Sequence, residues 1–124
     1  MRKLFFLTFW SFLITLAPQT LLANEKSALE ISEDEFVIGN KDAPITIIEY
    51  ASMSCSHCAS FHNNTLPDIK KEYIDTGKVR MVFRDYPFNS PALLGSMMMR
   101  CIASDVRYDY MNALYQLQNT WVNK

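Results

Sequence analysis

The stretch ITIIEYASMSCSHC, residues 45–58, carries the strongest information on the fold of this chain. Its first six residues are apolar, aromatic or β-branched apart from Glu49, which is typical of a strand buried on both faces, and we expect this strand to be the central one of its sheet. Two cysteines follow, Cys55 and Cys58, where apolar residues begin to recur at helical spacing. The stretch therefore predicts a strand that leads into a helix with a cysteine pair in its first turn.

A second strand completes a βαβ unit after this helix. The helix is predicted by residues that recur at three- and four-residue steps, namely Cys58, Phe61, Thr65, Ile69 and Tyr73. Pro67 lacks a backbone donor, so we expect a kink or a restart near Thr65, with the Thr65 hydroxyl as a cap, and we expect Gly77 to end the helix. Residues 79–84 predict the next strand, parallel to the first.

Shorter elements flank the βαβ unit. Residues 36–38 predict a short strand that ends in a turn at Gly39. Two helices follow the unit, from about residue 91 to 103 and from about 106 to 118. We expect the first to direct these residues toward a core: Leu94, Met97, Met98, Cys101 and Ile102. The second carries Tyr108, Met111, Leu114 and Tyr115.

The N-terminus has the pattern of a secretory signal. Arg2 and Lys3 precede an apolar run over residues 4–17, which is shorter than the roughly 20 residues that a membrane-spanning helix needs. We expect cleavage after Ala23, with an uncleaved anchor and a buried core helix as the alternatives. After cleavage the chain would keep no stable membrane anchor. Export would place the cysteines in an oxidising compartment, where a close pair is a disulfide or exchanges disulfides.

Composition limits the remaining possibilities. The 124 residues include 12 basic and 13 acidic side chains, 3 Gly and 5 Pro, and 49% are hydrophobic, as in one ordinary globular domain. This excludes a repeat array, a collagen and a disordered chain. The formal net charge of −1 offers no basic surface for nucleic acid, so we expect no such partner.

The cysteine pair has the residues for thiol–disulfide exchange. Cys55 meets unpaired backbone N–H groups at the helix N-terminus, which favour its thiolate and make it the attacking sulfur. His57 adds a positive or donor group that further stabilises the reduced form, so the disulfide would be oxidising. Cys58 lies one turn deeper and suits the resolving role. Glu49, at the end of the strand, could exchange a proton with Cys58.

Other interpretations of the pair remain open. A Cys-x-x-Cys pair can be a static disulfide or half of a zinc site. His62 lies on the same helical face as Cys58 and could complete a three-ligand site, but a lone histidine at this spacing is more often solvent-facing. The position of the pair within a βαβ unit favours the redox interpretation.

Short motifs on both sides of the cysteine pair match a known family. They are Gly39, Asp42-Ala43-Pro44, Glu49-Tyr50, Cys55-Ser56-His57-Cys58, Phe61, Gly77-Lys78-Val79 and Arg84-Asp85-Tyr86-Pro87. Together they resemble the DsbA family of periplasmic thiol:disulfide oxidoreductases. The resemblance implies an α/β thioredoxin fold with a helical insertion. It also implies that Cys55 is the nucleophile, Cys58 the resolving cysteine, His57 the tuning residue and Glu49 the buried acid. Ser56 stands where the family commonly has proline.

The same resemblance implies an activity and partners. Such an enzyme acts in the periplasm, hands disulfides to exported proteins with free thiols, and is reoxidised by a quinone-linked membrane protein. No metal, nucleotide or other organic cofactor is implied. A reductase or isomerase that acts with Cys55 and Cys58 reduced is the alternative within this chemistry. A non-catalytic remnant or binding module is the alternative from another class.

The family pattern continues beyond the last residue of this sequence. After its helical insertion the family has a cis-proline loop, two further strands and a last helix, and no proline follows Pro91 here. We therefore expect the N-terminal half of a longer enzyme. We divide it into a signal peptide (1–23), a flexible lead-in (24–34), a thioredoxin-like N-terminal half (35–90) and a partial helical insertion (91–124). Cys101 would then be a buried thiol, or a disulfide partner of the missing half.

Overall fold

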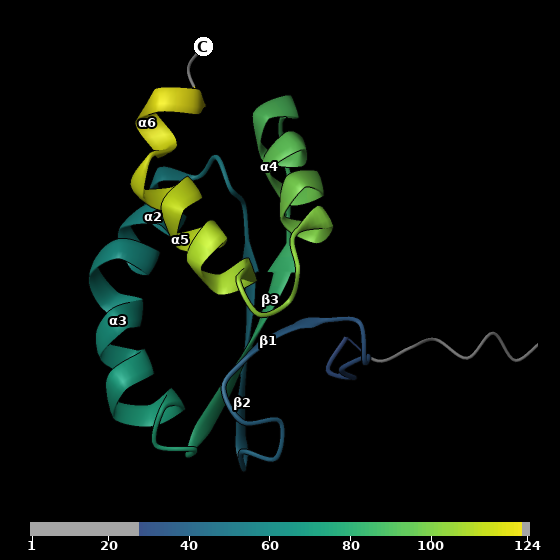
Figure 1. Cartoon of the computed structure of the whole chain (residues 1–124), viewed down its shortest axis with the longest axis vertical. Helices are drawn as coiled ribbons and strands as arrows, with labels where there is room; N and C mark the ends of the chain where they lie inside the picture. The colour runs from purple at the N-terminus through teal and green to yellow at the C-terminus, as the bar shows by residue number, and fades with distance from the viewer. Residues whose placement is uncertain (1–27, 123–124) are drawn as a thin grey trace, which may run out of the picture.

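The computed structural model describes residues 28–122, so the predicted signal peptide lies outside the described residues (Figure 1). The elements are, in order, β1 (Phe36–Ile38), β2 (Ile45–Ala51), α2 (Ser56–Ser60), η1 (Phe61–Thr65), α3 (Leu66–Ile69), η2 (Lys70–Ile74), β3 (Val79–Asp85), α4 (Ser90–Cys101), α5 (Arg107–Gln116) and α6 (Gln118–Trp121). Within the described range, every helix falls short of the length and apolarity that a membrane span requires. The helical segment 56–74 runs alongside the sheet, and α4, α5 and α6 gather near the carboxyl ends of β2 and β3 (Figure 1).

The sheet has the order β1-β3-β2, so β3 lies at its centre. β2 and β3 pair in parallel with Ile45 opposite Val79, and β1 pairs with β3 antiparallel. The predicted βαβ unit is thus confirmed, but the prediction that residues 45–50 form the central strand is wrong within the described residues. β2 is an edge strand there, and Ile45, Ile47 and Tyr50 are exposed. An apolar β-branched run shows that a strand forms without showing which strands lie beside it.

The helical segment 56–74 changes its winding around Pro67. The segment widens to a π-helix over Phe61–Thr65, and Pro67 sits in the first turn of α3. Proline cannot donate the backbone hydrogen bond of a regular turn, and the wider winding accommodates this loss. The predicted disturbance near Thr65 is confirmed. The predicted cap is wrong, because the Thr65 side chain makes no capping hydrogen bond.

Two glycines adopt positive φ angles at the ends of elements. Gly77, with φ 76°, ends the helical segment as predicted, and its N–H donates to the Ile74 carbonyl over 3.0 Å. Gly39, with φ 99°, follows β1 against the same helix end. A Cβ at Gly39 would lie 2.6 Å from Ile74 Cγ2 and 3.2 Å from the Val79 carbonyl oxygen, whereas a Cβ at Gly77 would meet nothing within 4 Å.

Gly39→Ala should therefore destabilise the fold more than Gly77→Ala does. Both substitutions force a side chain into a positive-φ conformation, which costs about 1 kcal/mol, and only Gly39→Ala adds a steric clash, for a total of about 3 kcal/mol. Urea unfolding of the two variants beside the parent protein measures the difference. Equal losses of unfolding free energy would show that Ile74 and Val79 do not crowd Gly39.

The helix α4 packs through its small residues. Its buried positions are Ala92, Gly95, Ser96 and Met99. The predicted core positions Leu94, Met97 and Met98 are 60%, 56% and 53% exposed, and Cys101 is exposed as well, so the prediction of this face and of a buried Cys101 thiol is wrong. Small residues let two segments approach closely: a Cβ at Gly95 would lie 3.0 Å from the Met53 Cβ. The pattern of large apolar residues therefore predicted the wrong face of α4 as the buried one.

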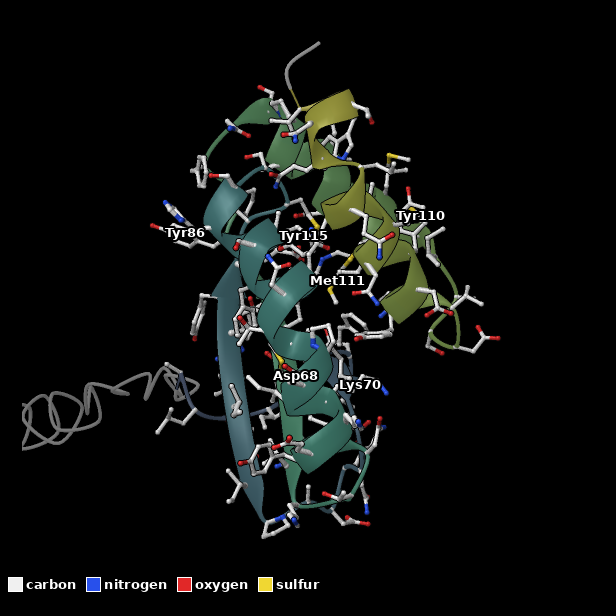
Figure 2. All side chains as sticks on the ribbon, turned by 90° about the vertical axis from the view of Figure 1, so that its left-hand side faces the viewer. Asp68, Lys70, Tyr86, Tyr110, Met111 and Tyr115 are labelled. Carbon is white, nitrogen blue, oxygen red and sulfur yellow. The ribbon has the colours of Figure 1, made fainter. Side chains whose placement is uncertain are left out.

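The helix α5 directs the residues expected of it toward the core. Met111 and Tyr115 are fully buried, and Tyr108 and Leu114 pack against the same core as partly buried residues. Figure 2 shows Met111 and Tyr115 between α5 and the helical segment 56–74. This packing places Tyr115 under the carboxyl end of β2, where the cysteine pair begins.

Candidate active site

The cysteine pair lies where β2 passes into α2, as predicted. Cys55 is the N-cap residue of α2, with an extended backbone at φ −80° and ψ 120°. Its N–H donates to the Ser52 carbonyl over 3.1 Å, and its own carbonyl accepts from the Ala59 N–H over 3.0 Å. Cys55 and Cys58 are both free thiols and both partly buried. The two sulfurs therefore sit at the open end of a helix, one turn apart.

The helix terminus favours the thiolate of Cys55. The backbone N–H of Cys58 is the largest influence that lowers the pKa of Cys55, and partial burial opposes it. The Cys58 thiol, which donates to the Cys55 sulfur, and the backbone N–H of His57 lower this pKa further. Orphan N–H groups at a helix start are the donors that a thiolate needs. The direction agrees with the sequence argument for an attacking sulfur at this position.

The surroundings of Cys58 act in the opposite direction. Burial is the main cause that raises the pKa of the Cys58 thiol, and a hydrogen bond with the Ser52 backbone partly offsets it. The thiol's hydrogen bond to Cys55 and the negative charges of Cys55 and Glu49 raise the pKa further. One sulfur of the pair is therefore stabilised as a thiolate and the other as a thiol.

The His57 side chain is exposed on the surface of α2. Its backbone N–H is the group through which His57 acts on Cys55 in this structure. A role of the imidazole in tuning the pair stays a prediction.

Glu49, on β2, acts on Cys58 through its charge and is hydrogen-bonded to a histidine. The His62 Nε2 is 3.1 Å from one Glu49 carboxylate oxygen and 3.0 Å from the other. The His62 side chain is fully buried, so the expectation that it faces solvent is wrong. His62 follows Cys58 by four positions, which places both side chains on the inner face of the helix. This spacing was the sequence signal for the burial of His62.

Across residues 28–122, no three His, Cys, Asp or Glu side chains are grouped to hold a metal ion.

Two further side chains of the site come from the C-terminal helices. Gln118 is buried, and its Nε2 donates to the carbonyls of Met53 over 2.9 Å and Cys55 over 3.0 Å. The Tyr115 hydroxyl donates to the Ser52 carbonyl over 3.4 Å, and burial raises the pKa of Tyr115. Sequence reasoning missed both roles, because each contact joins residues more than 60 positions apart.

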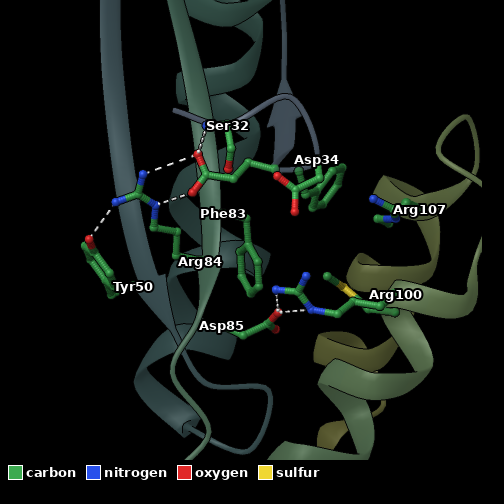
Figure 3. A pocket seen from close by; sticks show the side chains of 11 residues that line it. Ser32, Asp34, Tyr50, Phe83, Arg84, Asp85, Arg100 and Arg107 are labelled. Carbon is green, nitrogen blue, oxygen red and sulfur yellow. Dashed lines mark hydrogen bonds and ion pairs between the residues drawn. The ribbon is translucent and has the colours of Figure 1, made fainter. Parts of the chain in front are cut away.

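A separate pocket of about 300 Å³ lies between residues 32–36, the end of β3 and the helices α4 and α5 (Figure 3). Arg84 donates to Glu35 over 2.6 Å and to the Tyr50 hydroxyl over 2.7 Å, and Arg100 pairs with Asp85 over 2.9 Å. Arg84 also donates to backbone carbonyls of residues 28 and 30. The Arg84 contacts attach residues 28–35 to the sheet, and the Arg100–Asp85 pair joins α4 to β3. Neither cysteine of the pair lines the pocket. The candidate site is therefore the helix terminus and not this pocket.

Comparison with known proteins agrees with this geometry. The sequence model of the family described as "Thioredoxin" matches residues 31–124. The chain belongs to the thioredoxin family. The α/β thioredoxin-like fold expected from the sequence is confirmed, and so is the resemblance to DsbA proteins. The boundaries between the four segments expected from the sequence stay predictions.

Solved structures and curated relatives of this thioredoxin-family chain are named for disulfide chemistry. The crystal structure of Wolbachia pipientis alpha-DsbA1 has 35% sequence identity and a TM-score of 0.71, over 75% of this chain and 47% of that one. Oxidised BdbD from Bacillus subtilis has 26% identity and a TM-score of 0.64, over 67% of this chain and 47% of that one. A Rickettsia bellii protein, provisionally named a protein-disulfide oxidoreductase, is 40% identical over 76 residues, which are 61% of this chain and 29% of the relative. The chain thus spans less than a third of that relative and about half of the matched structures.

Proposed function

We propose that this protein is a thiol:disulfide oxidoreductase that exchanges disulfides with exported proteins through Cys55 and Cys58. The observation that carries the proposal is the opposed character of the two sulfurs at the start of α2. The pKa of Cys55 is lowered by backbone N–H groups, and the pKa of Cys58 is raised by burial. The names of the relatives support the same chemistry.

The exchange runs through a mixed disulfide. A client thiolate attacks the Cys55 sulfur of the Cys55–Cys58 disulfide, the S–S bond breaks, and its electron pair leaves with Cys58, which takes up a proton. A second client thiolate then attacks the client sulfur of the mixed disulfide, and Cys55 leaves as a thiolate. The client gains a disulfide and the pair gains two electrons. A sulfur with a lowered pKa is a good leaving group, so the helix terminus assists the second step.

The partners and the compartment belong to the same proposal. Exported proteins with free thiols are the clients, a membrane protein reoxidises the pair, and the periplasm is the location. The apolar run at residues 4–17 behind Arg2 and Lys3 supports export, and the names of the relatives support exchange with protein thiols. The chemistry needs only the two sulfurs and proton acceptors nearby, so no cofactor enters it.

Equilibration with glutathione buffers, followed by alkylation and mass spectrometry, tests the proposal. A stabilised Cys55 thiolate should give the pair a reduction potential above the roughly −270 mV of thioredoxin. The oxidised protein should also convert a reduced dithiol peptide to its disulfide, one peptide for each protein. A potential near that of thioredoxin would favour a reductase instead. A pair that forms a disulfide but transfers none would favour a binding module.

A further inference from the structure

The exchange steps given above do not involve the buried imidazole of His62. Its side chain is fully buried inside a cage of rings: it stacks on Tyr115 at 4.3 Å between centroids, and it meets Phe61 at 5.6 Å and Phe83 at 6.0 Å edge to face. These contacts come from η1, β3 and α5. The ring therefore cannot turn without moving the core.

A hydrogen bond joins this ring to Glu49. Nε2 lies at nearly equal distance from both carboxylate oxygens, 3.1 and 3.0 Å, while Nδ1 is buried and has no partner among the described residues. A protonated Nδ1 would be a buried donor without an acceptor, so the ring holds its proton on Nε2 and donates it to the carboxylate. His62 is a fixed donor aimed at Glu49.

The bond to His62 fixes the position of the Glu49 carboxylate. Glu49 lies on β2, which is the edge strand of the described sheet, and its side chain retains 15% exposure to solvent. A partly exposed carboxylate without such a partner can turn toward water. Burial is the main cause that raises the pKa of the Cys58 thiol, and the charge of Glu49 adds to it. The Tyr115 ring stacks on His62, and the Tyr115 hydroxyl donates to the carbonyl of Ser52, whose backbone is hydrogen-bonded to Cys58.

We infer that His62 is a positioning residue, which holds the Glu49 carboxylate where it accepts the proton of Cys58 when a mixed disulfide is resolved. The inference rests on the proposed function. This step regenerates the oxidised pair after Cys55 has formed a mixed disulfide with the protein that reoxidises it. The Cys58 S–H bond breaks and Glu49 takes the proton. The Cys58 sulfur then attacks Cys55, the Cys55–Cys58 bond forms, and the other sulfur leaves as a thiolate with the electron pair of the broken mixed disulfide.

Release of thionitrobenzoate from a mixed disulfide on Cys55 measures this step directly. The full chain carrying Cys101→Ser, which removes the exposed third thiol, is treated with Ellman's reagent, and the absorbance follows release by Cys58 from pH 5 to 9. His62→Phe keeps the ring but loses the donor, and should slow release roughly tenfold or more at neutral pH. The difference should shrink at high pH, because hydroxide then deprotonates Cys58. His62→Gln restores a donor and should recover most of the rate.

Two further variants separate positioning from simple structural damage. Phe61→Leu loosens the same ring cage without touching the Glu49 bond, and should leave the pH profile of release unchanged. If His62 acts through Glu49, adding His62→Phe to Glu49→Gln should slow release no further.

The groups that titrate around this position are Glu49 from β2, Cys55 and Cys58 from the start of α2, Tyr115 from α5 and Asp85 from β3.

The outcomes are distinguishable. Release in the His62 variants as fast as in the parent, or slowed equally at every pH and equally in Phe61→Leu, would overturn the role of His62. Additive losses in the double variant would overturn it as well. A parent protein that never forms or never releases the mixed disulfide would instead refute the proposed function.

Discussion

Cys58→Ser should leave a protein that accumulates as a mixed disulfide with its client, whereas Cys55→Ser should lower exchange to the background rate. Cys55 is the sulfur whose thiolate is stabilised by backbone N–H groups, so its loss removes both nucleophile and leaving group. In Cys58→Ser the Cys55 thiolate attacks a disulfide of the client and displaces one client thiolate, and the Cys58 thiol that would release the resulting adduct is missing. Non-reducing electrophoresis and mass spectrometry after reaction of the reduced variant with an unfolded protein that carries disulfides would detect the trapped adduct.

The third cysteine provides the matched control for this experiment. Cys101 is exposed on α4, outside the pair, so Cys101→Ser should exchange disulfides at the parent rate. An adduct on Cys58 in the Cys55→Ser variant, formed as fast as the adduct on Cys55 in Cys58→Ser, would contradict the assigned roles.

Tyr115→Ala should lower the free energy of unfolding by about 4 kcal/mol, more than Gly39→Ala does. The ring is 1% exposed, stacks on His62 and lies between α5 and the helix of the cysteine pair (Figure 2). Tyr115→Phe keeps the ring and loses only a long hydrogen bond to Ser52, so it should cost about 1 kcal/mol or less. Urea unfolding measures both. A domain of this size is stable by only about 5–15 kcal/mol, so the alanine variant should unfold at much lower urea.

A surface tyrosine tests whether the effect comes from burial. Tyr86 is 66% exposed, and Tyr86→Ala should change the unfolding free energy by about 0.5 kcal/mol or less. Equal losses in Tyr115→Ala and Tyr86→Ala would show that Tyr115 does not hold the C-terminal helices against the site.

The sequence was sufficient for the local features of the fold. The β-branched run before Glu49, the helical spacing after Cys55 and the position of Gly77 each depend on neighbours along the chain, and each prediction was confirmed. The cysteine pair at the start of α2 follows from the same local pattern.

Features that depend on distant contacts were not predictable in this way. The face of α4 was wrong because Gly95 and its small neighbours permit a close approach to Met53, which no periodicity of large residues reveals. The Glu49 partner of His62 lies 13 positions earlier, on another element, so the helical spacing that indicated burial did not reveal what the imidazole binds. Gln118 reaches Cys55 across 63 positions. The position of the two sulfurs therefore follows from the local sequence, whereas the contacts of Glu49 and Gln118 arise only when distant elements pack together.

The whole mechanism depends on the ionisation of Cys55, which the rate of its alkylation against pH measures. Alkylation with iodoacetamide, followed by mass spectrometry, measures the two cysteines separately, first in the folded protein and then in urea. An ordinary cysteine thiol has a pKa of about 8.5. A folded-state pKa below the unfolded value means that the thiolate persists at lower pH. We expect the midpoint for Cys55 in the folded protein to lie below its midpoint in urea, and the midpoint for Cys58 to lie above. Identical midpoints for Cys55 in the two states would refute the proposed role of the helix terminus.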